Sequence, residues 1–251
     1  MSIITVCFNA SSTILDTIHS VNKQTSCTEI EHVFVDGFSD DGTLELIRSN
    51  SRVDFRIFQT PKLGVYNAMN VGLLNACGEF VIFLNADDYF IDNLVLYEFI
   101  DIVRDFPLVN VVAGNVDYIE ANGSISRRWN VSKKDLYDLS QLPHPGLMVS
   151  RDLLINNNLF FDEKLILSGD YKQQLLFKSH THYQPLLLGR TVVQMRVGGL
   201  SNSSIWSRLT GVRECFESVW CVHGPLISCS FILVKLTRAV TARIKYWLKL
   251  S

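Results

Sequence analysis

Short apolar runs alternate with segments of helical spacing through residues 2–84. Each apolar run is followed by turn-forming residues, which is typical of a buried strand. Strands are predicted at residues 2–8, 31–35, 55–59 and 79–84. Apolar positions three and four residues apart predict helices at 13–23, 43–49 and 64–76. Strands that alternate with helices form right-handed crossovers, so the pattern predicts an α/β fold with a mostly parallel central sheet flanked by helices.

The second half of the chain continues this pattern less regularly. Further strands are predicted at residues 110–113, around 116–119, and at 146–149, and a helix is expected to begin near Tyr171. The sequence has no internal repeat and no low-complexity linker. Its composition changes near Ser201, which we take as the boundary between a domain at 1–200 and a tail at 201–251.

The tail has the pattern of a basic amphipathic helix. Its basic face holds Lys235, Arg238, Lys245 and Lys249, and its apolar face holds Leu233, Leu236, Val240, Ile244 and Trp247. From residue 190 onward the chain has nine Lys or Arg against two Glu, although its overall formal charge is −2. This pattern favours docking on an anionic membrane surface, and a helix packed on the main domain is the alternative. No nucleic-acid partner is expected, because the tail lacks a recognised binding motif.

The composition is that of a globular protein, with 47% hydrophobic and 19% charged residues. A mean hydropathy of +0.17 is high for an enzyme in water and indicates contact with something apolar. The first residues have no basic segment or cleavage site, and no apolar run reaches about 18 residues, so neither a signal peptide nor a spanning helix is expected. The six cysteines form no C-x-x-C pair, which favours buried free thiols over a zinc site.

Polar clusters follow three of the predicted strands, at residues 9–12, 36–41 and 85–88. Because ligands of open α/β sheets bind at the carboxyl ends of the strands, all three clusters are expected at one binding edge. Asp36 follows a buried strand and is expected to accept hydrogen bonds from a base or ribose; an Asx turn that leads into the next helix is the alternative.

Asp87 and Asp88 directly follow the most apolar of these strands. Two adjacent carboxylates repel each other unless a cation lies beside them, and hard oxygen ligands select Mg²⁺ or Mn²⁺. We therefore expect a divalent metal at this pair. The alternative is that the acids decorate the start of a helix near Asp92.

Several other enzyme classes are disfavoured by missing motifs. The chain has no Walker A sequence, no G-x-G-x-x-G after a strand and no G-x-S-x-G elbow. A bound diphosphate would therefore depend on metal and basic side chains. Lys62 is a candidate for this contact, although a solvated loop lysine is an equal interpretation. His144, in LPHPG, is a candidate to face an acceptor, and a plain turn residue is the alternative.

Six segments together resemble the bacterial family-2 glycosyltransferases of the GT-A fold. They are SIITVCFN, FVDGFSDDGT, GVYNAMNVG, GEFVIFLNADD, SGDY and GGLS, and they occur in the family's order between residues 2 and 201. The subgroup that the chain most resembles includes colanic-acid, O-antigen and capsule-type transferases. The resemblance implies a nucleotide-sugar half at about 1–110 and an acceptor half at about 111–200.

The resemblance also implies roles for particular residues. Thr5, Phe8 and Asn9 would line a nucleobase pocket, and Asp36 would hold the base. Asp87 would touch ribose or metal, Asp88 would share or take the metal, and Asp170, in SGDY, would be the catalytic base. An N-cap role in the helix near Tyr171 is the alternative for Asp170. Asn67 and Asn85 stand where many family members have Asp, so their site roles are weakened.

These residues lead to one functional hypothesis. The chain is expected to be an inverting, metal-dependent hexosyltransferase that moves a sugar from a nucleotide donor, UDP above all, to a saccharide on a polyprenyl-diphosphate lipid. Bacterial surface polysaccharide synthesis on the cytoplasmic face of the inner membrane is the expected setting. A non-catalytic nucleotide-sugar binder or membrane scaffold, and a nucleotidyltransferase, are the alternatives.

Overall fold

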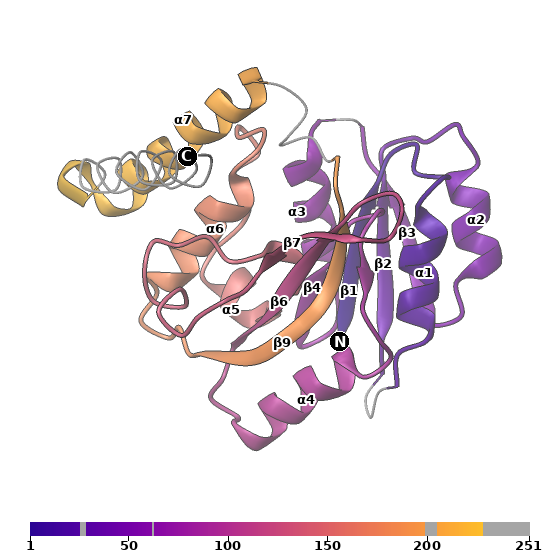
Figure 1. Ribbon diagram of the computed structural model, residues 1–251, viewed down its shortest axis with the longest axis horizontal. Coiled ribbons are helices and arrows are strands. Elements are labelled where there is room, and N and C mark those ends of the chain that lie inside the picture. Colours follow the sequence, from indigo (N-terminus) through magenta and orange to yellow (C-terminus); the bar gives the residue numbers. More distant parts are fainter. Residues whose placement is uncertain (26–28, 62, 199–204, 228–251) are drawn as a thin grey trace, which may run out of the picture.

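The computed structural model describes residues 1–25, 29–61, 63–198 and 205–227 (Figure 1). Within them lies one mixed, largely parallel sheet of order β3-β2-β1-β4-β8-β6-β9-β5, with β7 paired to β6. The strands are β1 Ser2–Cys7, β2 Glu31–Asp36, β3 Asp54–Gln59, β4 Phe80–Phe83, β5 Tyr89–Phe90, β6 Val111–Ile119, β7 Ile125–Trp129, β8 Leu147–Ser150 and β9 Pro185–Arg196.

The first four strands are parallel neighbours, as their alternation with helices predicts. β8 runs antiparallel to both β4 and β6, and β6 is parallel to β9. The segments predicted at 110–113 and 116–119 form one continuous strand, β6. β5, β7 and β9 were not predicted, and the helix expected from Tyr171 begins at Gly169.

Helices cover both faces of the sheet. They are α1 Ile14–Asn22, α2 Thr43–Asn50, α3 Val65–Asn75, α4 Val95–Asp105, α5 Arg151–Asn156, α6 Gly169–Lys178 and α7 Ile205–His223. Consecutive residues of β1 point to opposite faces, so that Ile4 joins the core beneath α3 and α5 while Ile3 joins the core beneath α1 and α4. At Gly72 of α3 an added Cβ would collide with the Ile4 side chain, so this glycine lets the helix lie close against the sheet.

α7 packs on the outer side of α6, through Cys215 and Val219 against Tyr171 and Leu175 (Figure 1). None of the helices in the described ranges is both long and apolar enough to cross a bilayer. The composition change at Ser201 and the tail positions 233–249 lie outside the described residues.

Candidate active site

The carboxyl ends of the parallel strands lie in one row. The register places Cys7 of β1 beside Asp36 of β2, and Asp36 beside Gln59 of β3. On the other side of β1, Leu84 follows β4 and donates its backbone N–H to the carbonyl of Ile4 over 2.9 Å. The three polar clusters therefore share one edge of the sheet, as expected from the strand order.

Hydrogen bonds join these clusters to one another. The backbone N–H of Asn9 donates to Ser39 Oγ over 2.8 Å, and the N–H of Asp40 donates to Asn9 Oδ1 over 3.1 Å. Asn9 has a left-handed backbone, with φ of 49°, which turns the chain sharply after β1. The Thr17 hydroxyl of α1 donates to the backbone carbonyl of Asp88 over 2.7 Å, so the third cluster is fixed beside the first two.

The carboxylate of Asp36 is fully buried and satisfied within the protein. It accepts the N–H and the hydroxyl of Ser39 over 3.0 and 2.5 Å, and the Gln59 amide over 3.2 Å. These are the contacts of an Asx turn, the structural alternative for this residue. A base bound by Asp36 would have to displace or share one of them.

Two other residues of the expected nucleobase pocket differ in exposure. Thr5 is fully buried, and its hydroxyl donates to the Leu84 carbonyl over 2.7 Å and lies 2.9 Å from His32 Nε2, so it links three strands. Phe8 has 43% of its surface exposed and packs against Gly37, where a Cβ would come within 3.2 Å of its ring. Phe8 thus faces the edge of the sheet, whereas Thr5 lies beneath it.

The remaining candidates of the donor half are Lys62 and Asn67. Lys62 lies outside the described residues. The Asn67 amide donates to Glu163 Oε2 over 3.0 Å, and its carbonyl oxygen accepts the Thr60 hydroxyl over 3.3 Å. Asn67 therefore connects α3 to the residue after β3, Thr60, and to Glu163 in the segment between α5 and α6.

Asp87 and Asp88 form a desolvated acidic pair. Asp88 is 1% exposed and accepts one hydrogen bond from Asn85 Nδ2 over 2.9 Å. Burial raises the pKa of both carboxyls, and the charge of Asp87 raises the pKa of Asp88 further. The pair is therefore poised to gain from a nearby cation.

Arg196, at the end of β9, supplies positive charge to this pair. Its backbone N–H donates to Asp88, and its charge lowers the pKa of both Asp87 and Asp88. The guanidinium forms an ion pair with Asp16 and lies 5.8 Å from the centre of the Tyr89 ring. In the sequence, Arg196 is only one of nine basic residues from 190 onward, and its place beside the acidic pair was not predicted.

Asp87 and Asp88 fit a divalent metal whose remaining ligands come from the substrate and water. In the described ranges no three His, Cys, Asp or Glu side chains are grouped to hold an ion alone. Mg²⁺ and Mn²⁺ need no such cage, since they commonly use one or two carboxylates and complete their coordination with phosphate oxygens and water. Asp87 and Asp88 would supply the protein's share.

Asp170 lies in the first turn of α6, and Ser168 occupies the N-cap position that was the alternative for Asp170. Its Oδ2 accepts from Gln141 Nε2 over 2.9 Å, and its Oδ1 lies 3.4 Å from the Tyr66 hydroxyl. Gly169 allows this approach, because a Cβ there would come within 2.7 Å of the Tyr66 ring. Both oxygens of the candidate base are thus oriented by neutral donors.

Glu214 of α7 fixes the turn that leads into Asp170. Its buried carboxylate accepts the backbone N–H groups of Ile166, Leu167 and Ser168 over 2.8, 2.9 and 2.9 Å. These donors precede α6 and have no partner within it. Sequence reasoning missed this residue, because its partners lie 46–48 positions away.

His144 lies on the other side of Asp170, in the 3₁₀ turn His144–Gly146. Its ring stacks on Phe83 at 5.1 Å and meets Phe161 edge-on at 5.5 Å. Burial lowers its pKa, while the charge of Asp170 acts in the opposite direction. The lowered pKa favours a neutral imidazole at neutral pH.

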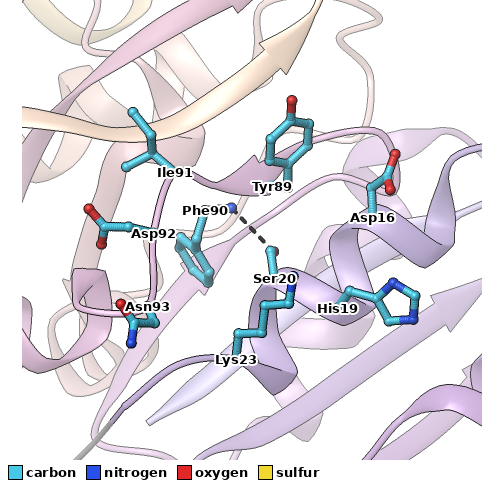
Figure 2. A pocket seen from close by; sticks show the side chains of 9 residues that line it. All are labelled: Asp16, His19, Ser20, Lys23, Tyr89, Phe90, Ile91, Asp92 and Asn93. Carbon is cyan, nitrogen blue, oxygen red and sulfur yellow. Dashed lines mark hydrogen bonds between the residues drawn. The ribbon is translucent and has the colours of Figure 1, made fainter. Parts of the chain in front are cut away.

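A groove of about 690 Å³ lies beside this edge, between α1 and the β5 segment (Figure 2). Asp16 and Ser20 of α1 and Lys23, just after the helix, line it on one side, facing residues 89–93. None of the predicted site residues lines the groove. We therefore place the chemistry at the strand ends and not in the groove.

Comparison with known proteins relates this arrangement to a family. The sequence profile described as "Glycosyl transferase family 2" matches residues 2–162. An uncharacterized glycosyltransferase of Mycobacterium tuberculosis is 29% identical over 146 residues, covering 58% of this chain and 49% of its own length. The putative teichuronic acid biosynthesis glycosyltransferase TuaG of Bacillus subtilis is 37% identical over 91 residues, 35% of this chain and 36% of TuaG. The chain spans about half the length of the first of these relatives.

Solved structures show the same fold. TarS 1-349 of S. aureus in complex with UDP-GlcNAc matches with a TM-score of 0.69 and 22% identity, over 88% of this chain and 67% of that one. The mannosyltransferase PcManGT of Pyrobaculum calidifontis, in complex with GDP-Man and Mn²⁺, matches with a TM-score of 0.62 and 15% identity, over 98% and 82%. The expected GT-A-like α/β fold is confirmed.

The raised pKa of Asp88 predicts that Asp88→Asn changes stability in a pH-dependent way. The pKa of Asp88 is higher in the folded chain than in the unfolded chain. The native state is therefore most stable below about pH 4, where the carboxyl is protonated in both states, and it loses stability as the pH rises above that value. In EDTA, Asp88→Asn should therefore raise the free energy of unfolding by on the order of 1–3 kcal/mol at neutral pH, and by much less near pH 4. Urea unfolding at the two pH values measures this, and an equal difference at both would contradict the assigned burial of charge.

Proposed function

Because the chain belongs to glycosyl transferase family 2, we propose that it transfers a sugar from a nucleotide-sugar donor, with UDP as the nucleotide, to a saccharide acceptor. The observation that carries the proposal is the desolvated pair Asp87–Asp88 on the same sheet edge as the loops at 9–12 and 36–41, with Asp170 beyond it. The structures of TarS with UDP-GlcNAc and PcManGT with GDP-Man and Mn²⁺ support this donor class and the metal. Membership of the family disfavours the nucleotidyltransferase alternative.

In this proposal one set of side chains acts on the leaving nucleoside diphosphate and another acts on the acceptor. Asp87 and Asp88 would hold a divalent ion, and Arg196 adds a fixed positive charge beside them. When bound, Mn²⁺ or Mg²⁺ supplies charge that stabilises a departing nucleoside diphosphate. Phe8 and Asn9 face the edge where the nucleobase would lie, with Asp36 shaping the loop beneath it.

Asp170 acts on the acceptor in this scheme. Gln141 and Tyr66 hold its carboxylate, and the neutral His144 nearby does not compete for the proton. The ionised carboxylate accepts the proton of the attacking hydroxyl, while the sugar–oxygen bond to the diphosphate breaks on the opposite face of the anomeric carbon. Such a displacement inverts the anomeric configuration.

The proposed setting is the synthesis of a bacterial surface polysaccharide, such as an O-antigen, capsule or exopolysaccharide. The names of TuaG, in teichuronic acid biosynthesis, and of TarS, a poly(ribitol-phosphate) β-N-acetylglucosaminyltransferase, support this general setting. A lipid-linked acceptor would place the enzyme on the cytoplasmic face of the inner membrane. The exposed apolar side chains Trp206, Leu209, Val212 and Trp220 of α7 support a membrane-facing C-terminal region, which the basic tail pattern at 233–249 would extend.

Metal dependence is the first expected outcome. Asp88→Ala should lower turnover of the donor by at least about 10²-fold, since it removes charge stabilisation of the leaving group. EDTA should abolish turnover, and Mn²⁺ should restore it in the wild type. Asp152→Ala, an exposed acid on α5, is the control and should retain activity. A donor screen followed by a coupled assay for released nucleotide measures this, and full turnover in EDTA would refute the metal's role.

Asp170→Asn separates acceptor chemistry from donor binding. The loss of a general base should lower kcat by about 10²–10⁴-fold, whereas the affinity for UDP, measured by calorimetry, should stay within about twofold. Tyr66→Phe removes only one partner of the carboxylate and should cost far less. Collapse of UDP affinity in Asp170→Asn would make the residue structural or a donor ligand. An NMR product spectrum with retained configuration would overturn direct displacement.

Truncation after Ser230 tests the proposed membrane docking. Removal of residues 231–251 deletes five Lys or Arg, each worth about 1 kcal/mol near an anionic surface. Sedimentation with anionic liposomes should be lost while activity on a short soluble acceptor is kept. Unchanged sedimentation would show that the tail does not dock the enzyme. A truncated chain that fails to fold would favour a tail packed on the domain.

A further inference from the structure

The hairpin of β6 and β7 carries an aromatic and cationic surface that the proposed chemistry does not use. On one side, β6 pairs with β8 through Val111–Ala113 and then with β7 from Val116 onward. On its other side, β6 pairs with β9. In the β6–β7 register, Tyr118 lies opposite Arg127, and Trp129 lies two residues beyond Arg127 on the same strand. Since residues two apart on a strand share a face, all three side chains lie on one side of the hairpin.

These three side chains contact one another, and we call them the aromatic platform. The rings of Tyr118 and Trp129 are nearly parallel, with an angle of 12° and centroids 6.3 Å apart. The guanidinium of Arg127 lies 4.9 Å from the centre of the Tyr118 ring and 5.3 Å from that of Trp129. Arg127 is exposed and both rings are partly exposed. Within the described ranges, Arg127 forms no ion pair with a carboxylate.

The platform borders the candidate active site. Tyr118 is paired across β6 and β9 with Met195, whose neighbour Arg196 donates its backbone N–H to Asp88. Burial raises the pKa of Tyr118, the charge of Arg127 lowers it, and the charges of Asp88 and Asp170 raise it further. The platform is thus next to the place where donor and base would meet.

The segment that includes β7 and follows it is rich in cations. Residues 125–134 contain Arg127, Arg128, Lys133 and Lys134 and no acid, and all four cations are exposed. Arg128 is exposed and forms only a long ion pair, at 3.9 Å, with the buried carboxylate of Asp117. These four cations give the segment a net positive charge, which suits an anionic partner.

We infer that the aromatic platform is the binding site for an acceptor saccharide that carries an anionic group, a carboxylate or a phosphate, on the sugar next to the reacting one. The apolar C–H face of a sugar ring packs on the aromatic faces, and the planar fork of Arg127 binds the anionic group through two hydrogen bonds. This inference rests on the proposed function, since it names the acceptor class for that same site.

Binding to a glycan array tests the inference. The full chain, saturated with UDP and Mn²⁺, is applied to an array of neutral, uronic-acid-containing and phosphate-containing bacterial oligosaccharides, which distinguishes the two anionic sources. Wild-type protein should bind anionic oligosaccharides at least about tenfold more tightly than their neutral counterparts. Arg127→Gln and Trp129→Ala should each weaken this binding by about tenfold or more, and Arg127→Lys should recover only part of it.

Three controls make the result decisive. Arg48→Gln removes an exposed charge from α2 and should leave glycan binding unchanged. Trp129→Phe preserves an aromatic face if Trp129→Ala fails to fold. UDP affinity should be the same in the wild type and in every variant. A wild-type chain that does not bind UDP would refute the proposed function. The inference about the platform is tested only by the glycan-binding results. Preference for neutral glycans, full binding by Arg127→Gln, or no glycan binding by a protein that binds UDP would each overturn it.

Discussion

The acidic pair that follows β4, with one carboxylate partly buried and the other fully buried, imposes the main constraint on this molecule. Asp87 and Asp88 lie where an apolar strand leaves the core, so each loses hydration while repelling the other. The protein offsets this with one amide from Asn85, one backbone N–H from Arg196 and the arginine's charge. Such an arrangement costs stability in isolation. In the proposed function, a divalent cation and the diphosphate of the donor would complete the site and make it favourable.

The second half of the chain contributes Asp170, an acid whose surroundings differ from those of this pair. Asp170 is held by neutral donors at the start of α6, and the turn before it is fixed by Glu214 of α7. α7 is therefore fastened to the site by its inner face, while its outer face exposes Trp206 and Trp220. In the proposed arrangement, one helix links the membrane-facing side of the protein to the turn that carries the base.

Residue patterns predicted the first four strands of the fold well, because β1, β2 and β4 are buried and read as near-continuous apolar runs. The partly exposed β3 was predicted as well, from its apolar residues at 55, 57 and 58. β9 escaped prediction because Gly189, at φ of 79°, and the irregular register with β6 break its pattern. β7 escaped because it is an exposed strand without apolar alternation. The acidic pair was visible from its place after a strand. The hydrogen bonds of Asp36 and the burial of Thr5 depend on neighbours from other strands, and no local pattern encodes them.

Electron paramagnetic resonance of Mn²⁺ tests the central claim most directly. The protein supplies only two carboxylates, so Mn²⁺ alone should bind weakly and UDP should tighten its binding by at least about tenfold. Reciprocally, Mn²⁺ should tighten UDP binding by the same factor, and Asp87→Asn combined with Asp88→Asn should remove this coupling. Mn²⁺ binding that is indifferent to UDP, or that survives in the double variant, would contradict the assignment of the acidic pair as the metal–diphosphate site.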